Sequence, residues 1–170
     1  MESLTVTMTG QSPLLMHAFP MNPIEALEKQ PPAAQAEYAA YRLPADGHGK
    51  GMLYLPGVNI QRALVAAAAY VKGKGRASLQ KQAAACLLVS PEHVTLGVRE
   101  YTVDSRPVVM PATKGRVMRH RPRLDHWQIT FQLDYDPILI SGKEVRTIVD
   151  NMGQRVGLLD FRPEKKGPMG

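Results

Sequence analysis

A band of basic residues with no acid among them lies between positions 106 and 123. Guanidinium groups bind phosphate oxygens through paired hydrogen bonds, and each neutralised phosphate releases counterions. We therefore predict that this band binds a polyanion with an affinity that falls steeply as salt rises. The alternative interpretation is the solvated face of a hairpin. The members of the band are Arg106, Lys114, Arg116, Arg119, His120, Arg121 and Arg123.

Met110 and Met118 lie on either side of the segment 111–115, where we expect the tip of a long projecting hairpin. Apolar side chains wedge between bases in some nucleic-acid complexes, so both methionines are candidates for that role. Ordinary packing within the hairpin is the alternative.

Three further segments offer groups that hold anions. The first turn of an expected helix has free N–H groups, the end of that helix carries cations that also complement its dipole, and a glycine-containing loop lets backbone amides approach closely. We predict that these groups bind phosphates together with the basic band. They are Asn59, Gln61 and Arg62 at the helix start, Lys72, Lys74 and Arg76 at its end, and Arg162, Lys165, Lys166 and Gly167 in the loop.

Candidate catalytic residues are harder to find in the sequence than candidate anion-binding residues. The five histidines are scattered without the short spacing of a helical metal site, and the lone Cys86 excludes an internal disulfide and a zinc site of several thiolates. Asp46, Asp104 and Asp125 are isolated carboxylates that could position a metal or a water for RNA cleavage, but solvated or ion-paired aspartates are commoner. We expect a protein without catalysis, bound metal or cofactor.

The composition indicates a basic, soluble protein. Its 170 residues hold 21 Lys and Arg against 15 Asp and Glu, and the net charge of +6 makes a nucleic-acid partner plausible. No apolar run approaches the ~20 residues needed to cross a bilayer, so we expect no membrane contact and a cytoplasmic location. The length fits one domain over 1–170, with 20–51 as an inserted, partly helical loop.

Period-two alternation and helical spacing define the expected elements. Ser141 and Glu144 form a capping box that starts the last helix, and Gly153 is a natural terminator for it. The predicted strands are 3–9, 94–98 and 127–133, and the other predicted helices are 58–71 and 78–88.

The order strand, helix, strand, strand, helix predicts an α+β fold. It is five sixths of the ferredoxin-like (RRM-like) plan, in which two helices cover one face of an antiparallel sheet. We expect residues 106–123 to project from this scaffold as a β-hairpin. We also expect the last strand of the plan to be missing after Gly170.

Two segments resemble motifs of the RAMP (repeat-associated mysterious protein) superfamily. Residues 53–64, LYLPGVNIQRAL, are similar to the motif in which a Pro-Gly turn opens the first helix of that fold. Residues 157–163, GLLDFRP, and 165–170, KKGPMG, are similar to the glycine-rich loop that follows the second helix and leads into the last strand. The chain thus resembles the subunits that line the guide RNA in CRISPR Cascade-type complexes.

The resemblance implies a non-catalytic subunit on guide RNA, with the 106–123 hairpin as a thumb folded over the strand. It also implies copies stacked head to tail, a contact that propagates instead of closing. Other CRISPR effector subunits and a complementary DNA or RNA target would be further partners. Two alternatives stay open: a metal-dependent ribonuclease of the same fold that uses Asp46 or Asp104, and a virus-encoded relative that binds a CRISPR complex through the 20–51 insertion.

Overall fold

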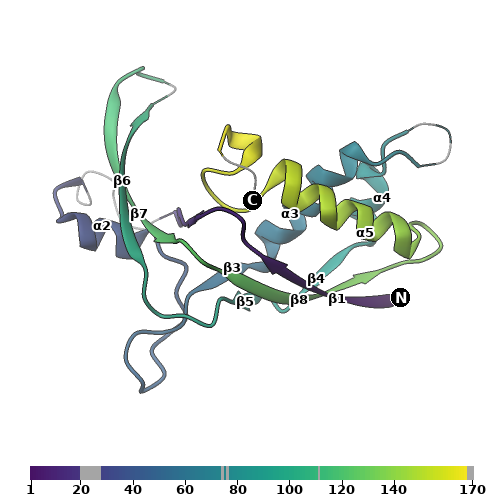
Figure 1. Ribbon diagram of the computed structural model, residues 1–170, viewed down its shortest axis with the longest axis horizontal. Helices are drawn as coiled ribbons and strands as arrows, with labels where there is room; N and C mark the ends of the chain where they lie inside the picture. Colours follow the sequence, from purple (N-terminus) through teal and green to yellow (C-terminus); the bar gives the residue numbers. More distant parts are fainter. Residues whose placement is uncertain (20–27, 74, 76, 111, 168–170) are drawn as a thin grey trace.

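The computed structural model describes residues 1–19, 28–73, 75, 77–110 and 112–167, and these form an α+β fold with antiparallel sheets (Figure 1). The strands are β1 (Glu2–Thr9), β2 (Leu14–Leu15), β3 (Tyr54–Pro56), β4 (Leu88–Ser90), β5 (His93–Thr95), β6 (Thr102–Val109), β7 (Arg116–Leu124) and β8 (Gln128–Tyr135). The helices are α2 (Pro32–Tyr38), α3 (Gly57–Ala67), α4 (Gln80–Cys86) and α5 (Gly142–Asn151), with the short turns η1 (Ala68–Tyr70), η3 (Met152–Val156) and η4 (Pro163–Lys165).

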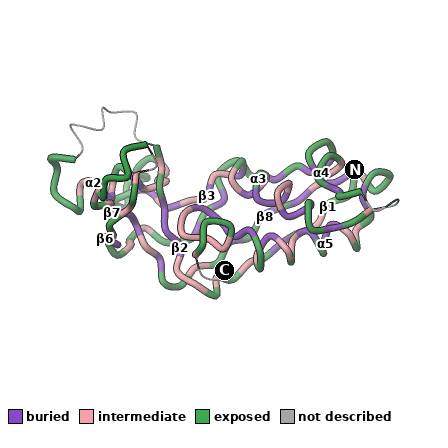
Figure 2. The backbone as a smooth tube through the Cα atoms, turned by 90° about the horizontal axis from the view of Figure 1, so that it is seen from above, coloured by how far each residue is buried: buried purple, intermediate pink, exposed green. Residues whose placement is uncertain are grey.

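The central sheet has the strand order β1-β8-β4, and each neighbouring pair is antiparallel. Val6 lies opposite Phe131, so the apolar side chains of β1 and β8 point to one face. Helices α3 and α5 cover that face, and Ile60 and Ile148 from these helices join the same buried cluster (Figures 1 and 2). This layer of helices on a sheet contains the hydrophobic core.

The other face of the central sheet is polar and exposed. Thr5, Thr7, Gln128 and Gln132 all point to solvent. The hydroxyls of Thr7 and Thr130 are hydrogen-bonded at 3.0 Å across the strand pair. Period-two alternation produces this arrangement, because one set of side chains enters the core and the other set faces water.

Strands β1 and β8 confirm the strands predicted at 3–9 and 127–133. Helix α3 together with η1 confirms the helix predicted at 58–71, and α4 confirms the helix predicted at 78–88. None of the described helices has the length and apolar content to cross a membrane.

The strand predicted at 94–98 is wrong in extent, and it is not a strand of the central sheet. Strand β5 ends at Thr95 and pairs with β3, and Gly97 leaves the strand with a left-handed φ of 69°. The strand beside β8 is β4, where Val89 lies opposite Leu133. Three residues of β-structure next to an alanine-rich helix are too short to produce a recognisable alternation.

The last helix starts as predicted and ends later. The Ser141 hydroxyl accepts a hydrogen bond from the Glu144 amide at 3.4 Å, and the Glu144 carboxylate accepts one from the Ser141 amide at 2.8 Å, which confirms the capping box. Gly153 is not the terminator. The chain continues through the π-helical turn η3, which keeps both Met152 and Val156 in the core, and it leaves the helix at Gly157 with a φ of 72°.

Strands β6 and β7 form the predicted hairpin, which is confirmed. A second sheet of order β2-β7-β6 joins it to the body, where Leu14 pairs with Leu124. Beyond this junction the hairpin extends away from the central sheet and its helices (Figure 1).

The inserted segment 20–51 is partly helical, as predicted, because it contains α2; residues 20–27 lie outside the described part of the chain. Helix α2 lies against β7. Arg42 fixes the end of the insertion through Glu37 at 2.5 Å and through the carbonyl oxygen of Arg99 at 2.8 Å. The insertion thus supports the base of the hairpin.

We predict that Phe131→Ala destabilises the fold by about 3–5 kcal/mol, because this side chain is buried in the middle strand of the central sheet. Gln132→Ala, on the exposed face of the same strand, should change the free energy of unfolding by less than about 0.5 kcal/mol. Urea unfolding followed by circular dichroism measures both. Equal losses in the two variants would contradict the assignment of the core face.

Candidate nucleic-acid interface

The arginines of the hairpin lie mostly on one of its faces. Arg106 pairs with Arg119 across the ladder, and Asp104 pairs with Arg121. Residues directly opposite each other in an antiparallel ladder point to the same side. Val108 follows on that side and lines a cleft beside the hairpin. The basic face therefore looks onto this cleft.

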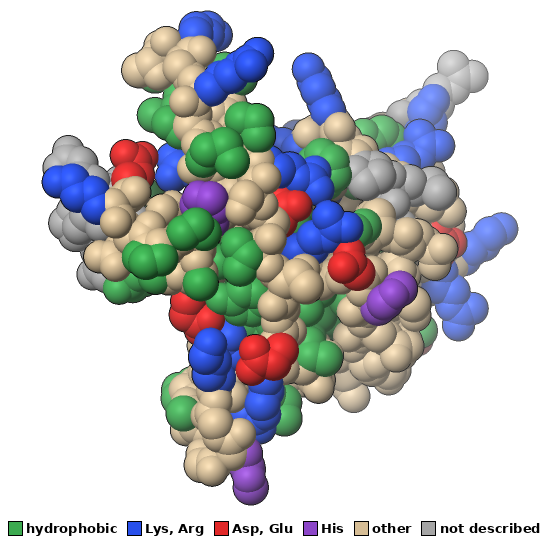
Figure 3. Space-filling model, turned by 60° about the vertical axis from the view of Figure 1, so that its left-hand side comes forward, with side chains coloured by type: hydrophobic (Ala, Val, Ile, Leu, Met, Phe, Trp, Pro, Cys, Tyr) green, Lys and Arg blue, Asp and Glu red, His purple; other side chains and the backbone are tan. Residues whose placement is uncertain are grey.

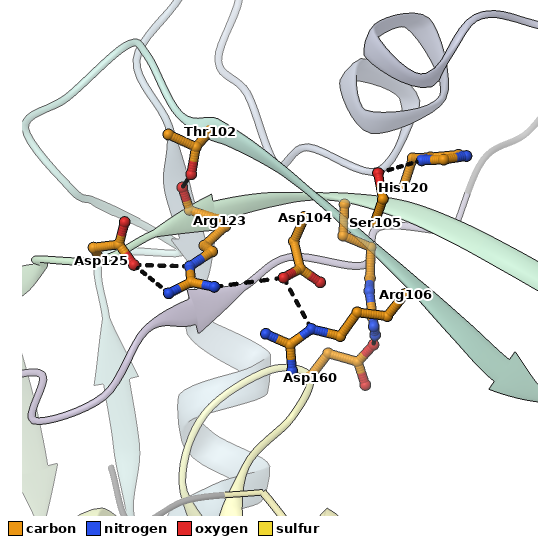
Figure 4. Close-up of polar contacts among 9 residues, drawn as sticks. Thr102, Asp104, Ser105, Arg106, His120, Arg123, Asp125 and Asp160 are labelled. Carbon is orange, nitrogen blue, oxygen red and sulfur yellow. Dashed lines mark hydrogen bonds and ion pairs between the residues drawn. The ribbon is translucent and has the colours of Figure 1, made fainter.

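In the half of the hairpin nearer the body, the protein's own acids neutralise the arginines of this face. Our expectation of an uncompensated band is therefore wrong there. Asp104 accepts a hydrogen bond from Nε of Arg106 at 2.9 Å and lies 3.6 Å from Nη1 of Arg123 (Figure 4). Arg123 also pairs with Asp125 at 2.7 Å. These acids flank the band in sequence, outside the 106–123 window.

Arg121 is buried and pairs with Asp160, which follows the last helix. Nδ1 of His17 lies 3.5 Å from the same carboxylate oxygen. The hydrogen bond from His17 and the charge of Arg121 together lower the pKa of Asp160 to about 2. Asp160 is therefore ionised at neutral pH and joins the hairpin to the C-terminal loop and to the segment after β2.

The distal half of the hairpin keeps its cations free. No carboxylate of the described residues forms an ion pair with Lys114, Arg116 or Arg119. Viewed from the hairpin side, Lys and Arg side chains stand at its far end, whereas acids and bases alternate nearer the body (Figure 3). Arg119 lies directly opposite Arg106 in the ladder, where the two like charges repel each other.

The remaining predicted residues of the hairpin are partly exposed. His120 shares a hydrogen bond of 2.7 Å with the Ser105 hydroxyl. Met118 is 52% exposed on the opposite face from Arg119. The sulfur of Met110 lies 3.9 Å from Nη2 of Arg119, so this methionine packs on the basic face. Of the two methionines, Met118 is the better placed to reach a base.

A cleft of about 630 Å³ lies between α3, the C-terminal loop and the hairpin. It brings together Asn59, Arg62 and Arg162 from the predicted set. His17 and Tyr41 line it as well, and neither was singled out from the sequence. Both come from segments without a local motif, so no short-range pattern could have identified them.

The C-terminal loop is shaped by close backbone approaches. A side chain at Gly167 would place its Cβ 1.9 Å from the carbonyl oxygen of Phe161, so this position requires glycine. The guanidinium of Arg106 lies over the Phe161 ring, 4.4 Å from its centre. Lys165 and Lys166 are exposed on this loop, and Arg162 pairs with Glu164 at 2.8 Å. The loop thus adds free lysines beside the basic face.

Other predicted contacts lie elsewhere. Gln61 donates a hydrogen bond of 2.7 Å to the carbonyl oxygen of Leu87, so its amide joins α3 to the start of β4. Lys72 is exposed and follows η1, at the opposite end of α3 from Asn59 and Arg62. Lys74 and Arg76 lie outside the described residues.

The carboxylates considered for catalysis are already engaged. Asp46 accepts two hydrogen bonds from Arg99, at 3.0 and 2.7 Å, which lower the pKa of this exposed acid. Asp104 is held by Arg106 and Arg123. Across the described ranges, no three His, Cys, Asp or Glu side chains come together as metal ligands.

No known family model matches the sequence, and no curated protein matches it.

Asp160→Asn should destabilise the protein by about 2 kcal/mol, because it leaves the buried Arg121 without its counter-charge; the loss is below that of a fully buried pair since Asp160 keeps 35% of its side-chain surface exposed. Asp125→Asn, which removes an exposed partner of Arg123, should cost less than about 1 kcal/mol. Chemical denaturation at pH 7 compares the two variants.

The same pair predicts a pH dependence. The pKa of Asp160 is about 2 in the folded protein, against a usual value of 3.8, so its stabilisation is complete above pH 4 and is lost as the pH falls toward 2. The difference in unfolding free energy between the wild type and Asp160→Asn should shrink over this range. A constant difference from pH 7 to pH 2 would refute the role of this carboxylate.

Proposed function

We propose that this protein is a non-catalytic subunit that binds single-stranded RNA along the basic face of the hairpin and the cleft beneath it. The observation that carries the proposal is the set of free cations at the far end of the hairpin: Arg119 on the face that looks onto the cleft, Arg116 on the opposite face and Lys114 in the turn between the strands. A structural hairpin would gain nothing from unpaired arginines there. Phosphates supply the missing counter-charge.

A ferredoxin-like scaffold is the finer fold assignment that we propose. The sheet order β1-β8-β4, with α3 between β1 and β4 and α5 after β8, corresponds to the first five elements of that plan. In the plan, the last strand would pair along the outer edge of β1. The hairpin of β6 and β7 is then an insertion between the second and third strands.

The exposed sheet face is a poor candidate for the RNA site. RRM-type sheets stack bases on aromatic side chains. The described side chains on this face of β1 and β8 are hydroxyl, amide and one carboxylate groups: Ser3, Thr5, Thr7, Thr9, Gln128, Thr130, Gln132 and Asp134. The proposed RNA path therefore runs on the helix and hairpin side of the molecule.

The resemblance to RAMP proteins extends the proposal to the partners. Guide RNA of a CRISPR Cascade-type complex would be the ligand, and copies of the chain would follow one another head to tail along it. Other effector subunits and a complementary DNA or RNA target would complete the assembly. The projecting hairpin supports the proposed head-to-tail arrangement, because a projecting element can contact a neighbouring copy.

Charge reversal at the hairpin tests the binding surface. Arg116→Glu combined with Arg119→Glu should lower the affinity for a single-stranded RNA about tenfold or more at low salt, and the slope of log K against log salt should shrink by about 1.4. Fluorescence anisotropy measures both quantities. Arg121 is unsuitable for this test because its reversal would disrupt the buried pair with Asp160.

The matched control moves the same charge change away from the hairpin. Lys81→Glu combined with Arg146→Glu alters exposed residues of α4 and α5 and changes the net charge equally. If binding is local, this variant keeps nearly full affinity. Equal losses in both double variants would indicate attraction by net charge and would remove the hairpin from the proposal.

RNA that copurifies with the protein tests the assembly. Nucleic acid extracted after purification from the expression host should be RNA whose protected lengths differ by a constant increment, because each added copy covers the same number of nucleotides. Ribonuclease treatment before electrophoresis defines the protected lengths. Protein that purifies free of nucleic acid and fails to bind added RNA would contradict the proposal.

A further inference from the structure

The cleft has the size of a small-molecule site. Its volume of about 630 Å³ falls in the range of roughly 300–1,000 Å³ that such sites occupy. Its lining is mixed. The apolar side chains are Ala63, Ala66, Val108, Val156 and Leu159, Tyr41 adds an aromatic ring, and the polar and charged side chains are His17, Asn59, Arg62, Asp160, Arg162 and Glu164.

We propose that this cleft receives one unstacked base of the bound RNA, and that Asp160 selects a base with an exocyclic amino group. The inference rests on the proposed function and deepens it, because it assigns a base-reading role to a cleft beside a surface that otherwise contacts only phosphates.

The space in the cleft comes from small side chains on α3. Ala63 and Ala66 stand one turn apart on the side of the helix that faces the cleft, next to Asn59 and Arg62 on the preceding turn. Larger residues at the alanine positions would fill the cleft. The apolar side chains and the Tyr41 ring in this lining can contact the face of a base, which single-stranded RNA exposes when it unstacks.

Asp160 provides the selective group. Its Oδ2 atom is occupied by Arg121 and His17, whereas no described group forms a hydrogen bond or ion pair with Oδ1. The low pKa of Asp160 keeps the carboxylate ionised at neutral pH, so Oδ1 only accepts hydrogen bonds. An amino group of cytosine, adenine or guanine can donate to it. The O4 carbonyl of uracil, in the place of the cytosine amino group, cannot donate and would be repelled.

Two further groups can complete the contact. The amide of Asn59 has no hydrogen-bond partner among the described residues, so it is available to a base edge. Arg62 is exposed and forms no ion pair with a described carboxylate, so it is available to the adjoining phosphate. Val108, which follows Arg106 along the basic face, links the cleft to the path proposed for the backbone.

A matched pair of oligonucleotides and a matched pair of variants test this inference. Oligocytidine and oligouridine of equal length have the same backbone charge and differ in the group at ring position 4. Wild-type protein should prefer oligocytidine by about tenfold, the value of one hydrogen bond to a charged group. Ala66→Leu, which fills the cleft with a good helix former, should abolish the preference and keep the salt slope.

Ala69→Leu is the control, because Ala69 is exposed one turn further along and does not line the cleft. It should retain the preference. Asn59→Leu is a second cleft variant in case Ala66→Leu does not fold, and it should also reduce the preference. Preference unchanged in both cleft variants would overturn the base site and leave RNA binding by the hairpin standing.

The base in the cleft could belong to a bound RNA strand or to a free mononucleotide, and competition by free mononucleotides distinguishes these two ligands. Cytidine monophosphate should compete with the oligonucleotide only weakly, since the proposed site gains its affinity from a base attached to a bound backbone. Tight competition that Ala66→Leu removes, without any change in oligonucleotide binding, would make the cleft a mononucleotide site and overturn the inference. Absence of RNA binding by the wild-type protein would overturn both this inference and the proposed function.

Discussion

The carboxylate of Asp160 joins three parts of the chain that are far apart in sequence. It pairs with Arg121 of the hairpin, lies 3.5 Å from His17 after β2, and belongs to the loop that follows the last helix. Because Arg121 is buried, this pair cannot be replaced by water without loss. This ion pair therefore acts together with the pairing of β2 and β7 and with the hydrogen bond from the Asp160 amide to the Leu15 carbonyl oxygen in fixing the hairpin beside the C-terminal loop.

This constraint explains why the basic band is divided. Near the body, acids neutralise arginines and fix their positions, as Asp104 does for Arg106 and Arg123. Further out, Lys114, Arg116 and Arg119 have no such partners in the described chain and remain exposed to a ligand. A hairpin whose charges were all free would repel itself and would lack a fixed base. The neutralised half positions the free half.

Local patterns predicted the elements whose environment is uniform along their length. Alternation identified β1 and β8 because each has one face in the core and one in water, and the capping box at Ser141 identified the start of α5. The end of that helix was missed because the burial of Val156 extends it past Gly153, and burial is a property of the tertiary structure.

The candidate site was predicted in part for the same reason. The hairpin and its cations follow from local composition, and so does the placement of Arg62 in the first turns of α3. The partner of Arg121 is 39 residues away, and no spacing rule connects the two. An acid-free window in the sequence therefore does not establish an acid-free surface, because the counter-charges can arrive from another segment.

Neighbouring alanines of α3 have two different roles. Ala67 is fully buried and allows the helix to pack closely on its neighbours, whereas Ala66 borders the cleft. Helix propensity favours alanine equally at these positions, so the sequence cannot distinguish a tight contact from a preserved space. The distinction is made by the C-terminal loop, which lines the cleft together with Ala66. Asp160 of this loop both pairs with Arg121 of the hairpin and lines the cleft, so one carboxylate belongs to both features.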